Sequence, residues 1–160
     1  MIRFRYGRHG RPDLADNPLD LRFTVSHSSG HAVVAVTHQS DLGIDIEESR
    51  RIDHLDSLAQ RYLAPVEIEQ LASADDRVRG FWMVWTRKEA YVKALGIGLS
   101  GPICEFAVSL LEPARLLTTG KPGDDSADWT LLDLSYDAFT VALAVRARRV
   151  LVDVHHQIDA

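Results

Sequence analysis

The sequence has little of what marks secreted, membrane or nucleic-acid-binding proteins. Its one cysteine, Cys104, has no second cysteine with which to form an internal disulfide. No run of 18 apolar residues is present, so no transmembrane helix is predicted. The basic residues near the N-terminus (Arg3, Arg5 and Arg8) are not followed by an apolar segment, so no signal peptide is predicted. These absences lead us to expect a cytoplasmic protein.

An excess of positive charge is also missing. Eighteen basic residues stand against 23 acidic ones, which gives a formal net charge of −5. That balance argues against general binding to nucleic acid or anionic membranes, because no global positive field attracts phosphates. Hydrophobic residues make up 46% of the chain and charged residues 26%, as is ordinary for a folded domain. The length of 160 residues fits one domain, or one and a fraction.

Hydrophobic periodicity predicts an α+β domain, with an antiparallel sheet packed against a long helix. The expected helices cover 53–63, 65–73 and 76–95. The expected strands cover 1–6, 23–25, 32–37, 42–47, 105–110, 115–119, 129–134 and 139–146. We divide the chain into a lead-in segment at 1–21, a domain at 22–150 and a tail at 151–160.

The strand expected at 42–47 alternates between apolar and acidic positions. Alternation places Asp45 and Glu47 on one face, about 7 Å apart. Two carboxylates at that spacing can share a small hard cation with a third oxygen donor. The same pattern also fits a half-buried strand whose acidic face is solvated.

The long helix carries Trp85, Glu89 and Lys93 along one stripe, because residues four apart share a helix face. Glu89 and Lys93 can form a stabilising surface pair beside a core tryptophan, or they can act on a ligand. Earlier in the chain, Ser26, His27 and Ser28 end a strand at a turn, where they can meet a phosphate or simply cap the turn. No hydrolase triad is expected, since no nucleophile-elbow motif is present.

These segments occur in an order that resembles the signature of 4′-phosphopantetheinyl transferases. The resemblance is carried by Ser-His-Ser at 26–28, Gly-Ile-Asp-Ile-Glu at 43–47 and Trp-Thr-Arg-Lys-Glu-Ala-Tyr-Val-Lys at 85–93. It is greater for the surfactin-type branch, whose Gly-Lys-Pro element is similar to Gly-Arg-Pro at 10–12. The resemblance covers about residues 4–145 and corresponds to the second of that branch's two similar halves.

The resemblance implies a Mg²⁺ site formed by Asp45, Glu47 and Glu89. Glu89 would also remove the proton from the attacking serine of a carrier protein, directly or through a metal-bound water. Lys88 and Lys93 would contact phosphate oxygens, and Lys93 would help the departing 3′,5′-ADP. The implied reaction is transfer of 4′-phosphopantetheine from coenzyme A to an acyl or peptidyl carrier protein.

The resemblance also implies contacts from Arg11, Ser26 and His27 to the adenosine 3′-phosphate region of coenzyme A. Arginine suits this role because its planar guanidinium forms paired hydrogen bonds to phosphate.

The first half of the surfactin-type enzymes has no counterpart in this sequence. A truncated chain, a natural half that self-associates and a degenerate relative without activity are three explanations that stay open. By analogy with the single-half carrier-protein synthases, homo-oligomerisation is one expectation. Two alternative functions are a half-domain that binds coenzyme A or a carrier protein without turnover, and a Mg²⁺-dependent phosphodiesterase.

Overall fold

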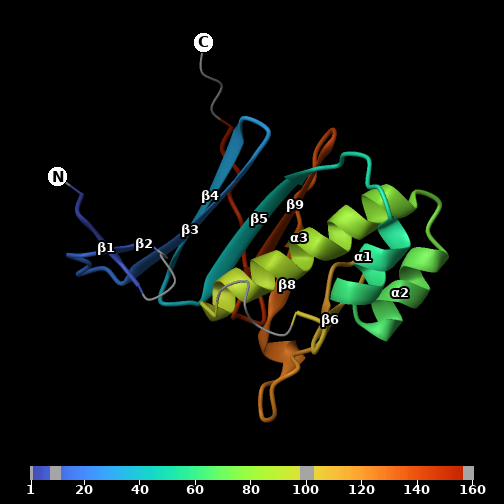
Figure 1. The fold of residues 1–160 in the computed structure, drawn as a ribbon. Coiled ribbons are helices and arrows are strands. Elements are labelled where there is room, and N and C mark those ends of the chain that lie inside the picture. Colours follow the sequence, from blue (N-terminus) through green and yellow to red (C-terminus); the bar gives the residue numbers. More distant parts are fainter. Residues whose placement is uncertain (1, 8–11, 98–102, 157–160) are drawn as a thin grey trace.

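A long helix lying across one face of a three-stranded antiparallel sheet forms the centre of the protein (Figure 1). The computed structural model describes residues 2–7, 12–97 and 103–156. The sheet has the order β5 (Leu42–Glu48), β9 (Phe139–Val145) and β8 (Thr130–Asp133). The helix is α3 (Arg77–Leu95), which begins after the N-cap Asp76 and ends at Gly96 in a left-handed conformation.

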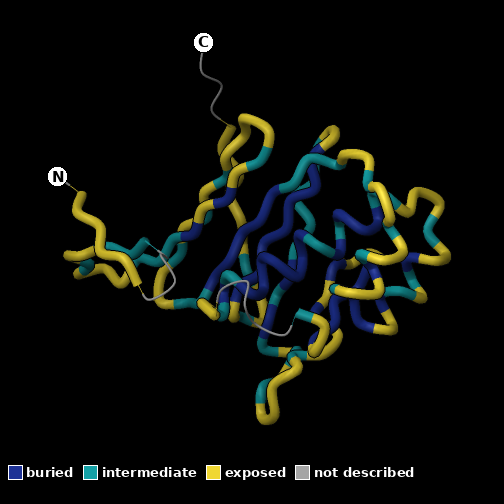
Figure 2. Tube along the Cα trace, viewed as in Figure 1, coloured by how far each residue is buried: buried dark blue, intermediate teal, exposed yellow. Residues whose placement is uncertain are grey.

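Both faces of the β5-β9-β8 sheet are covered by apolar side chains. On the face away from α3, Leu42, Ile44 and Ile46 pack with Val141 and Leu143. On the other face, β9 supplies Ala142 and Ala144 to the larger core around α3, and these small side chains suit a closely packed helix. Figure 2 shows that the buried part of the chain is concentrated in α3 and this sheet.

Gly43 sets the distance between β5 and α3. A Cβ atom at this position would lie 2.0 Å from the carbonyl oxygen of Ala90 and 2.5 Å from the backbone nitrogen of Ala94. No side chain fits at such distances, so the backbones of the strand and the helix touch at Gly43. This contact brings the side chains of β5 and α3 that flank it close together.

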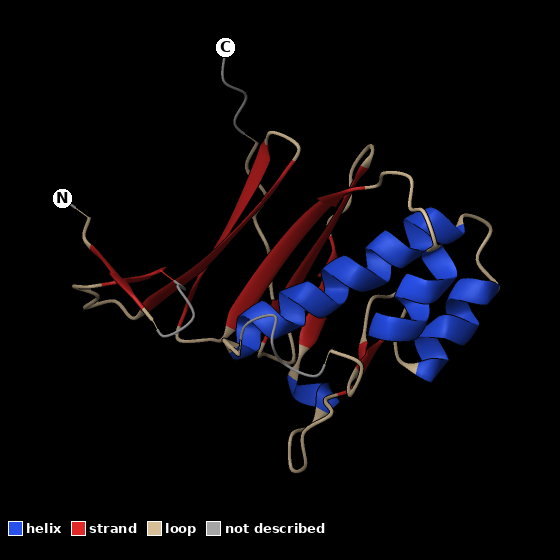
Figure 3. Cartoon of the chain, in the orientation of Figure 1, coloured by secondary structure: helices blue, strands red, loops and turns tan. Residues whose placement is uncertain are grey.

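Two shorter helices, α1 (Leu55–Tyr62) and α2 (Pro65–Ala72), pack against α3 on the side away from the N-terminal strands (Figure 3). Proline at the first position of α2 is favourable, because the missing N–H would have no partner inside the helix. Between α3 and β8 the chain forms β6 (Ala107–Val108), β7 (Leu116–Thr118) and the 3₁₀ turn η1 (Ser126–Asp128).

The aromatic side chains of the core gather around α3. The ring of Tyr91 meets Trp129 edge-on, with ring centroids 4.8 Å apart. Earlier on the helix, Phe81 and Trp85 stack at 6.1 Å, and the indole of Trp82 donates a hydrogen bond to the carbonyl oxygen of Arg50. Trp85 therefore contributes to packing, as the sequence predicted.

The N-terminal part forms two hairpins, β1 (Phe4–Tyr6) with β2 (Pro12–Leu14) and β3 (Leu21–Ser28) with β4 (His31–His38). The second hairpin extends beside β5 and turns one face to solvent (Figure 1). On that face the register pairs Phe23 with Val36, Val25 with Val34, and His27 with Ala32. We call these six residues the outer ribbon.

The predicted α+β class and the three predicted helices are confirmed, with helix ends within two residues of those expected. The strand β2 was not predicted, and several predicted strands differ in length, two of them by more than the rest. The strand predicted at 23–25 extends over Leu21–Ser28, whereas the one predicted at 105–110 shortens to Ala107–Val108 beside a register shift. The division at residues 21 and 150 stays a prediction. Among the described residues no helix is long and apolar enough to cross a bilayer.

Candidate active site

Asp45 is the point at which β3, β5 and α3 meet. Its side chain faces α3, and only 4% of the residue is exposed, so the face of β5 that carries it is covered rather than solvated at this position. The Oδ1 atom accepts hydrogen bonds from the Ser26 hydroxyl at 2.8 Å and from the Lys93 ammonium at 2.7 Å. Lys93 Nζ also donates to Ser26 Oγ at 2.8 Å.

The alignment of β3 with β5 brings hydroxyl groups to the carboxylates. Ser26 reaches Asp45, and two residues later the Ser28 hydroxyl donates to Glu47 Oε2 at 3.0 Å. Both pairs are separated by 19 residues, so β3 and β5 run in the same direction. Because side chains on a strand alternate, the two serines share one face and meet the two acids in register.

Glu89 lies on α3 one turn before Lys93 and is 5% exposed. The pKa of its carboxyl group is raised to about 7, mainly by burial and also by the negative charges of Asp45 and Glu47, whereas Lys93 opposes the increase. Asp45, Glu47 and Glu89 are therefore close enough for the charge of one acid to change the pKa of another. A carboxyl group with a pKa near 7 can take up or release a proton close to neutral pH.

The pKa values of the two strand acids are raised as well. For Asp45 the main cause is burial, which is opposed by the charge and hydrogen bond of Lys93. For Glu47 burial again raises the pKa, the Ser28 hydrogen bond lowers it, and the charge of Asp45 raises it. The site therefore carries more negative charge than its surroundings stabilise, which favours an added cation.

The carboxylate oxygens of the site are suitable ligands for a hard divalent cation. Within the described part of the chain, Asp45 Oδ2 and Glu89 Oε1 are buried and have no hydrogen-bond partner. Carboxylate oxygens are the ligands that Mg²⁺ prefers, and a bound cation would satisfy such buried oxygens. In the same described residues, no three His, Cys, Asp or Glu side chains are grouped closely enough to enclose an ion, and Lys93 supplies the positive charge beside Asp45. A cation held by these acids would therefore require side-chain rearrangement.

Comparison with known proteins identifies the family. A profile of the 4′-phosphopantetheinyl transferase superfamily matches residues 41–144, the segment that contains Asp45, Glu47, Glu89 and Lys93. The chain belongs to this superfamily. Among curated members, the 4′-phosphopantetheinyl transferase HetI of a Nostoc species is 38% identical over 88% of the chain, and Sfp of Bacillus subtilis is 34% identical over 72%.

The chain spans about half the length of the curated phosphopantetheinyl transferases that it matches. It aligns with 59% of HetI and 50% of Sfp. Among solved structures, the holo-[acyl-carrier-protein] synthase of Thermotoga maritima is similar, with a TM-score of 0.55 and 26% sequence identity. That likeness covers 68% of this chain and 64% of the synthase.

Lys88 does not lie where the phosphopantetheinyl transferase resemblance implied. The residue has 0% exposed surface, and its Nζ atom donates to both carboxylate oxygens of Glu67 at 2.8 Å. A phosphate would have to enter the core and displace Glu67 to reach this ammonium. Lys88 thus has a buried counter-charge in this structure, and its contact with coenzyme A stays a prediction.

His27 lies on the opposite face of β3 from the two serines that contact the acids. It belongs to the outer ribbon and is exposed, whereas Ser26 and Ser28 face β5. The structure thus brings Ser26 to the carboxylates of the candidate site but does not bring His27 there. Arg11 lies outside the described residues.

The sequence interpretation missed one contributor to the candidate site and the partner of Lys88. Ser28 holds Glu47, and the equal spacing of Ser26-x-Ser28 and Asp45-x-Glu47 is a signal that could have suggested it. Glu67 is the partner of Lys88, and their buried contact depends on how α2 packs against α3. No local pattern in the sequence around Glu67 indicates that contact.

An open pocket among the described residues lies apart from the carboxylates of the candidate site. It has a volume of about 540 Å³ and lies between the β1-β2 hairpin and β3. Arg5 and Arg22 line it, but each is already paired with an acid, Asp13 and Asp41 respectively. The buried ionic chemistry at Asp45 and Glu89, rather than the volume of this pocket, identifies the candidate active site.

Proposed function

We propose that this protein transfers the 4′-phosphopantetheine group of coenzyme A to a serine of an acyl or peptidyl carrier protein, releasing 3′,5′-ADP in a Mg²⁺-dependent reaction. The observation that carries the proposal is the cluster of Asp45, Glu89 and Lys93, two buried acids and a lysine, within the segment that matches the superfamily. The curated relatives are named as transferases of this kind.

The proposed metal ligands are Asp45, Glu47 and Glu89. When bound there, Mg²⁺ would offset the negative charge of the coenzyme A diphosphate as its P–O bond breaks. The buried oxygens of Asp45 and Glu89 without partners among the described residues support this assignment.

Glu89 is proposed to accept the proton of the carrier serine. The serine oxygen attacks the phosphorus attached to pantetheine, a new P–O bond forms, and the bond to the 5′-phosphate of 3′,5′-ADP breaks. Burial raises the pKa of Glu89 in the metal-free protein, which supports a role for this carboxyl group in proton transfer.

Lys93 is proposed to stabilise the phosphate oxygens and the departing 3′,5′-ADP. Its ammonium group already contacts Asp45, and its side chain is 30% exposed, so it is accessible from solvent while remaining beside the acids. A positive charge held in this way stabilises negative charge that develops on the leaving group.

The adenosine end of coenzyme A is proposed to contact Arg11, Ser26 and His27. Two features of the described residues support these contacts. The Ser26 hydroxyl lies within the carboxylate cluster, and the His27 imidazole is exposed on the outer ribbon. A ligand that crosses the edge of β3 would meet both side chains.

The protein is proposed to act in the cytoplasm, with a carrier protein as its partner. Its functional form is proposed to be a homo-oligomer. Support comes from the outer ribbon, because Val34 and Val36 are each 61% exposed on a surface rich in β-branched side chains. Apolar patches of this kind commonly mark protein–protein contacts.

The direct test is incubation of the purified protein with coenzyme A, Mg²⁺ and a panel of apo carrier proteins, followed by intact mass spectrometry. We expect one carrier to gain the mass of a phosphopantetheine group, and we expect EDTA to abolish the gain. Asp45→Asn and Glu89→Ala should each reduce transfer by about a hundredfold or more, because each removes a charged group from the reaction site. The exposed Asp53→Asn serves as the matched control.

Each contrary outcome of this test has a defined meaning. Binding of coenzyme A without any mass gain would replace the proposal with a module that does not turn over. Cleavage of phosphodiesters without coenzyme A would favour the hydrolytic alternative. Full transfer in the presence of EDTA would overturn the role of the metal.

A further inference from the structure

Three consecutive ionic residues on α3, Arg87, Lys88 and Glu89, are all buried. Successive residues of an α-helix point about 100° apart around its axis, so the three side chains leave the helix toward three different parts of the protein. Glu89 lies one turn before Lys93, whose ammonium contacts Asp45 of β5, whereas the two cations pair with acids elsewhere in the protein. Buried cations are rare and are found with counter-charges, so each one connects α3 to a particular neighbour.

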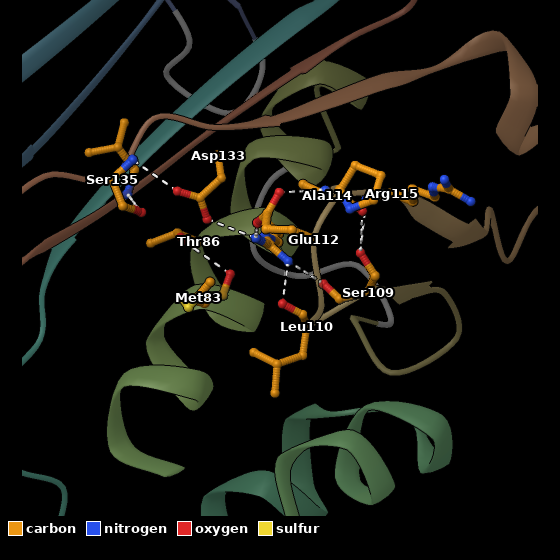
Figure 4. A network of polar contacts seen from close by, with 12 residues as sticks. Met83, Thr86, Ser109, Leu110, Glu112, Ala114, Arg115, Asp133 and Ser135 are labelled. Carbon is orange, nitrogen blue, oxygen red and sulfur yellow. Dashed lines mark hydrogen bonds and ion pairs between the residues drawn. The ribbon is translucent and has the colours of Figure 1, made fainter. Parts of the chain in front are cut away.

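Arg87 connects α3 to the segment after β6 and to β8. One guanidinium nitrogen donates to the carbonyl oxygens of Ser109 at 2.6 Å and Leu110 at 2.8 Å. The other donates to Asp133 at 2.7 Å and to Glu112. Figure 4 shows these four acceptors converging beside the helix from two different segments of the chain.

Lys88 connects α3 to α2 and β6. Its Nζ atom donates to Glu67 and, at 2.7 Å, to the carbonyl oxygen of Phe106. Glu67 in turn accepts hydrogen bonds from the backbone nitrogens of Ala64 at 2.6 Å and Val108 at 2.7 Å. The pair therefore joins the first turn of α2, the strand β6 and the middle of α3 in one fully buried network.

Together these contacts resist rotation of α3 about its own axis. A turn of the helix by the angle of one residue would withdraw Arg87 and Lys88 from all their acceptors and would leave buried charges without partners, which is strongly unfavourable. Gly43 limits the separation of α3 from β5, whereas the two cations limit its rotation. The direction in which Glu89 points is a consequence of both constraints.

We propose that Arg87 and Lys88 are positioning residues, which hold Glu89 toward Asp45 and Glu47 without contacting coenzyme A. This inference rests on the proposed function, in which those three acids bind the divalent cation. It gives Lys88, which is inaccessible to a phosphate, a role in the same site.

The test uses the double variant Lys88→Met/Glu67→Gln, which removes both charges of the pair and so leaves no buried ion without a partner. Leu71→Ala is the matched stability control. Leu71 is buried on α2 and packs against α3 at Gly80, more than two turns before Glu89. Mn²⁺ replaces Mg²⁺ as the probe, and its affinity for the protein alone is measured by electron paramagnetic resonance without coenzyme A or carrier.

We expect the double variant to remain folded by circular dichroism and to bind Mn²⁺ roughly tenfold more weakly, as is typical when residues supporting metal ligands are removed. Its kcat should fall by a similar factor, while its KM for coenzyme A stays within about twofold of the original. Arg87→Lys keeps the buried charge but loses the planar guanidinium, and should also weaken Mn²⁺ binding. Leu71→Ala should lower stability and leave Mn²⁺ affinity unchanged.

Three results would overturn the inference. Unchanged Mn²⁺ affinity in a folded double variant and in Arg87→Lys would show that Glu89 is held by other contacts. A large increase in KM for coenzyme A, with Mn²⁺ binding intact, would restore Lys88 as a phosphate ligand. Failure of the unaltered protein to bind Mn²⁺ at all would refute the metal role in the proposed function, and this inference with it.

Discussion

Glu89 illustrates how a single carboxyl group can link stability to chemistry. Its pKa is about 7, compared with 4.5 for the same group in solvent. The folded protein therefore holds a proton at Glu89 over a pH range in which the unfolded chain has lost it. Ionising Glu89 above that range costs folding free energy, and the same ionisation provides the base and metal ligand of the proposed reaction.

We predict that Glu89→Gln changes the pH dependence of stability. The stabilising contribution of protonated Glu89 is complete below about pH 4.5 and is lost as the pH rises through about 7. Without metal, the variant and the original protein should have similar stability near pH 4.5, and the variant should be more stable at pH 8 by up to about 3 kcal/mol. Denaturant unfolding in EDTA at several pH values measures this difference.

The control for that prediction is Glu69→Gln, a change at an exposed position on α2 that should leave the pH profile unaltered. Equal stability of Glu89→Gln and the original protein at pH 8 would show that the burial of Glu89 does not oppose its ionisation.

Much of the candidate site could be predicted at the scale of single residues. The alternation at 42–47 and the four-residue spacing of Glu89 and Lys93 follow from local geometry, and the structure brings Asp45 and Lys93 together. Whether a charged residue faces the core or solvent is decided by its tertiary neighbours. The burial of Lys88 could therefore not be predicted, since its partner Glu67 lies on another helix.

The contact between β5 and α3 is possible because Gly43 has no side chain. We predict that Gly43→Ala separates the strand from the helix and costs about 2–3 kcal/mol or more, because the added methyl group would overlap backbone atoms that cannot rotate away. Transfer activity and Mn²⁺ affinity should fall with it, since Asp45 and Glu89 lie on the two separated elements. Thermal unfolding, activity assays and Mn²⁺ titration check the three effects.

Gly123→Ala is the matched control for Gly43→Ala. A methyl group at Gly123 would meet no atom within 4 Å, and its φ of 82° leaves only the backbone cost of about 1 kcal/mol. If the two variants were equally stable and active, the close approach of β5 and α3 would not constrain the site.

The helices could be located from sequence more accurately than some strands, for a physical reason. Apolar periodicity, the cap Asp76 and the terminator Gly96 are local signals, and they define α3 to within a residue. The ends of β3 and β6 depend instead on pairing with β4 and β7. Backbone hydrogen bonds extend β3 into polar positions that carry no apolar pattern, so its length could not be predicted.

For the molecule as a whole, the outer ribbon is the surface most suited to self-association. We predict that the protein forms a homo-oligomer in solution and that Val34→Glu/Val36→Lys dissociates it, because charges would be buried in an apolar contact. Sedimentation equilibrium of both proteins measures the change in mass. Val154→Glu, an exposed valine near the C-terminus, is the control and should not alter assembly.

A monomer that transfers phosphopantetheine at full rate would contradict that prediction. The ribbon would then be a surface for the carrier protein, and the same double variant should raise the KM for the carrier.

The arrangement of aromatic side chains determines what intrinsic fluorescence can report. All three tryptophans lie on α3 or pack against it, and the β3-β4 hairpin contains none. Tryptophan emission therefore follows the environment of the long helix and is insensitive to detachment of the hairpin that carries Ser26 and Ser28. An unfolding curve recorded by fluorescence can look like a single transition even if Ser26 and Ser28 have already separated from Asp45 and Glu47. A dye or added tryptophan on β4 is needed to observe that step.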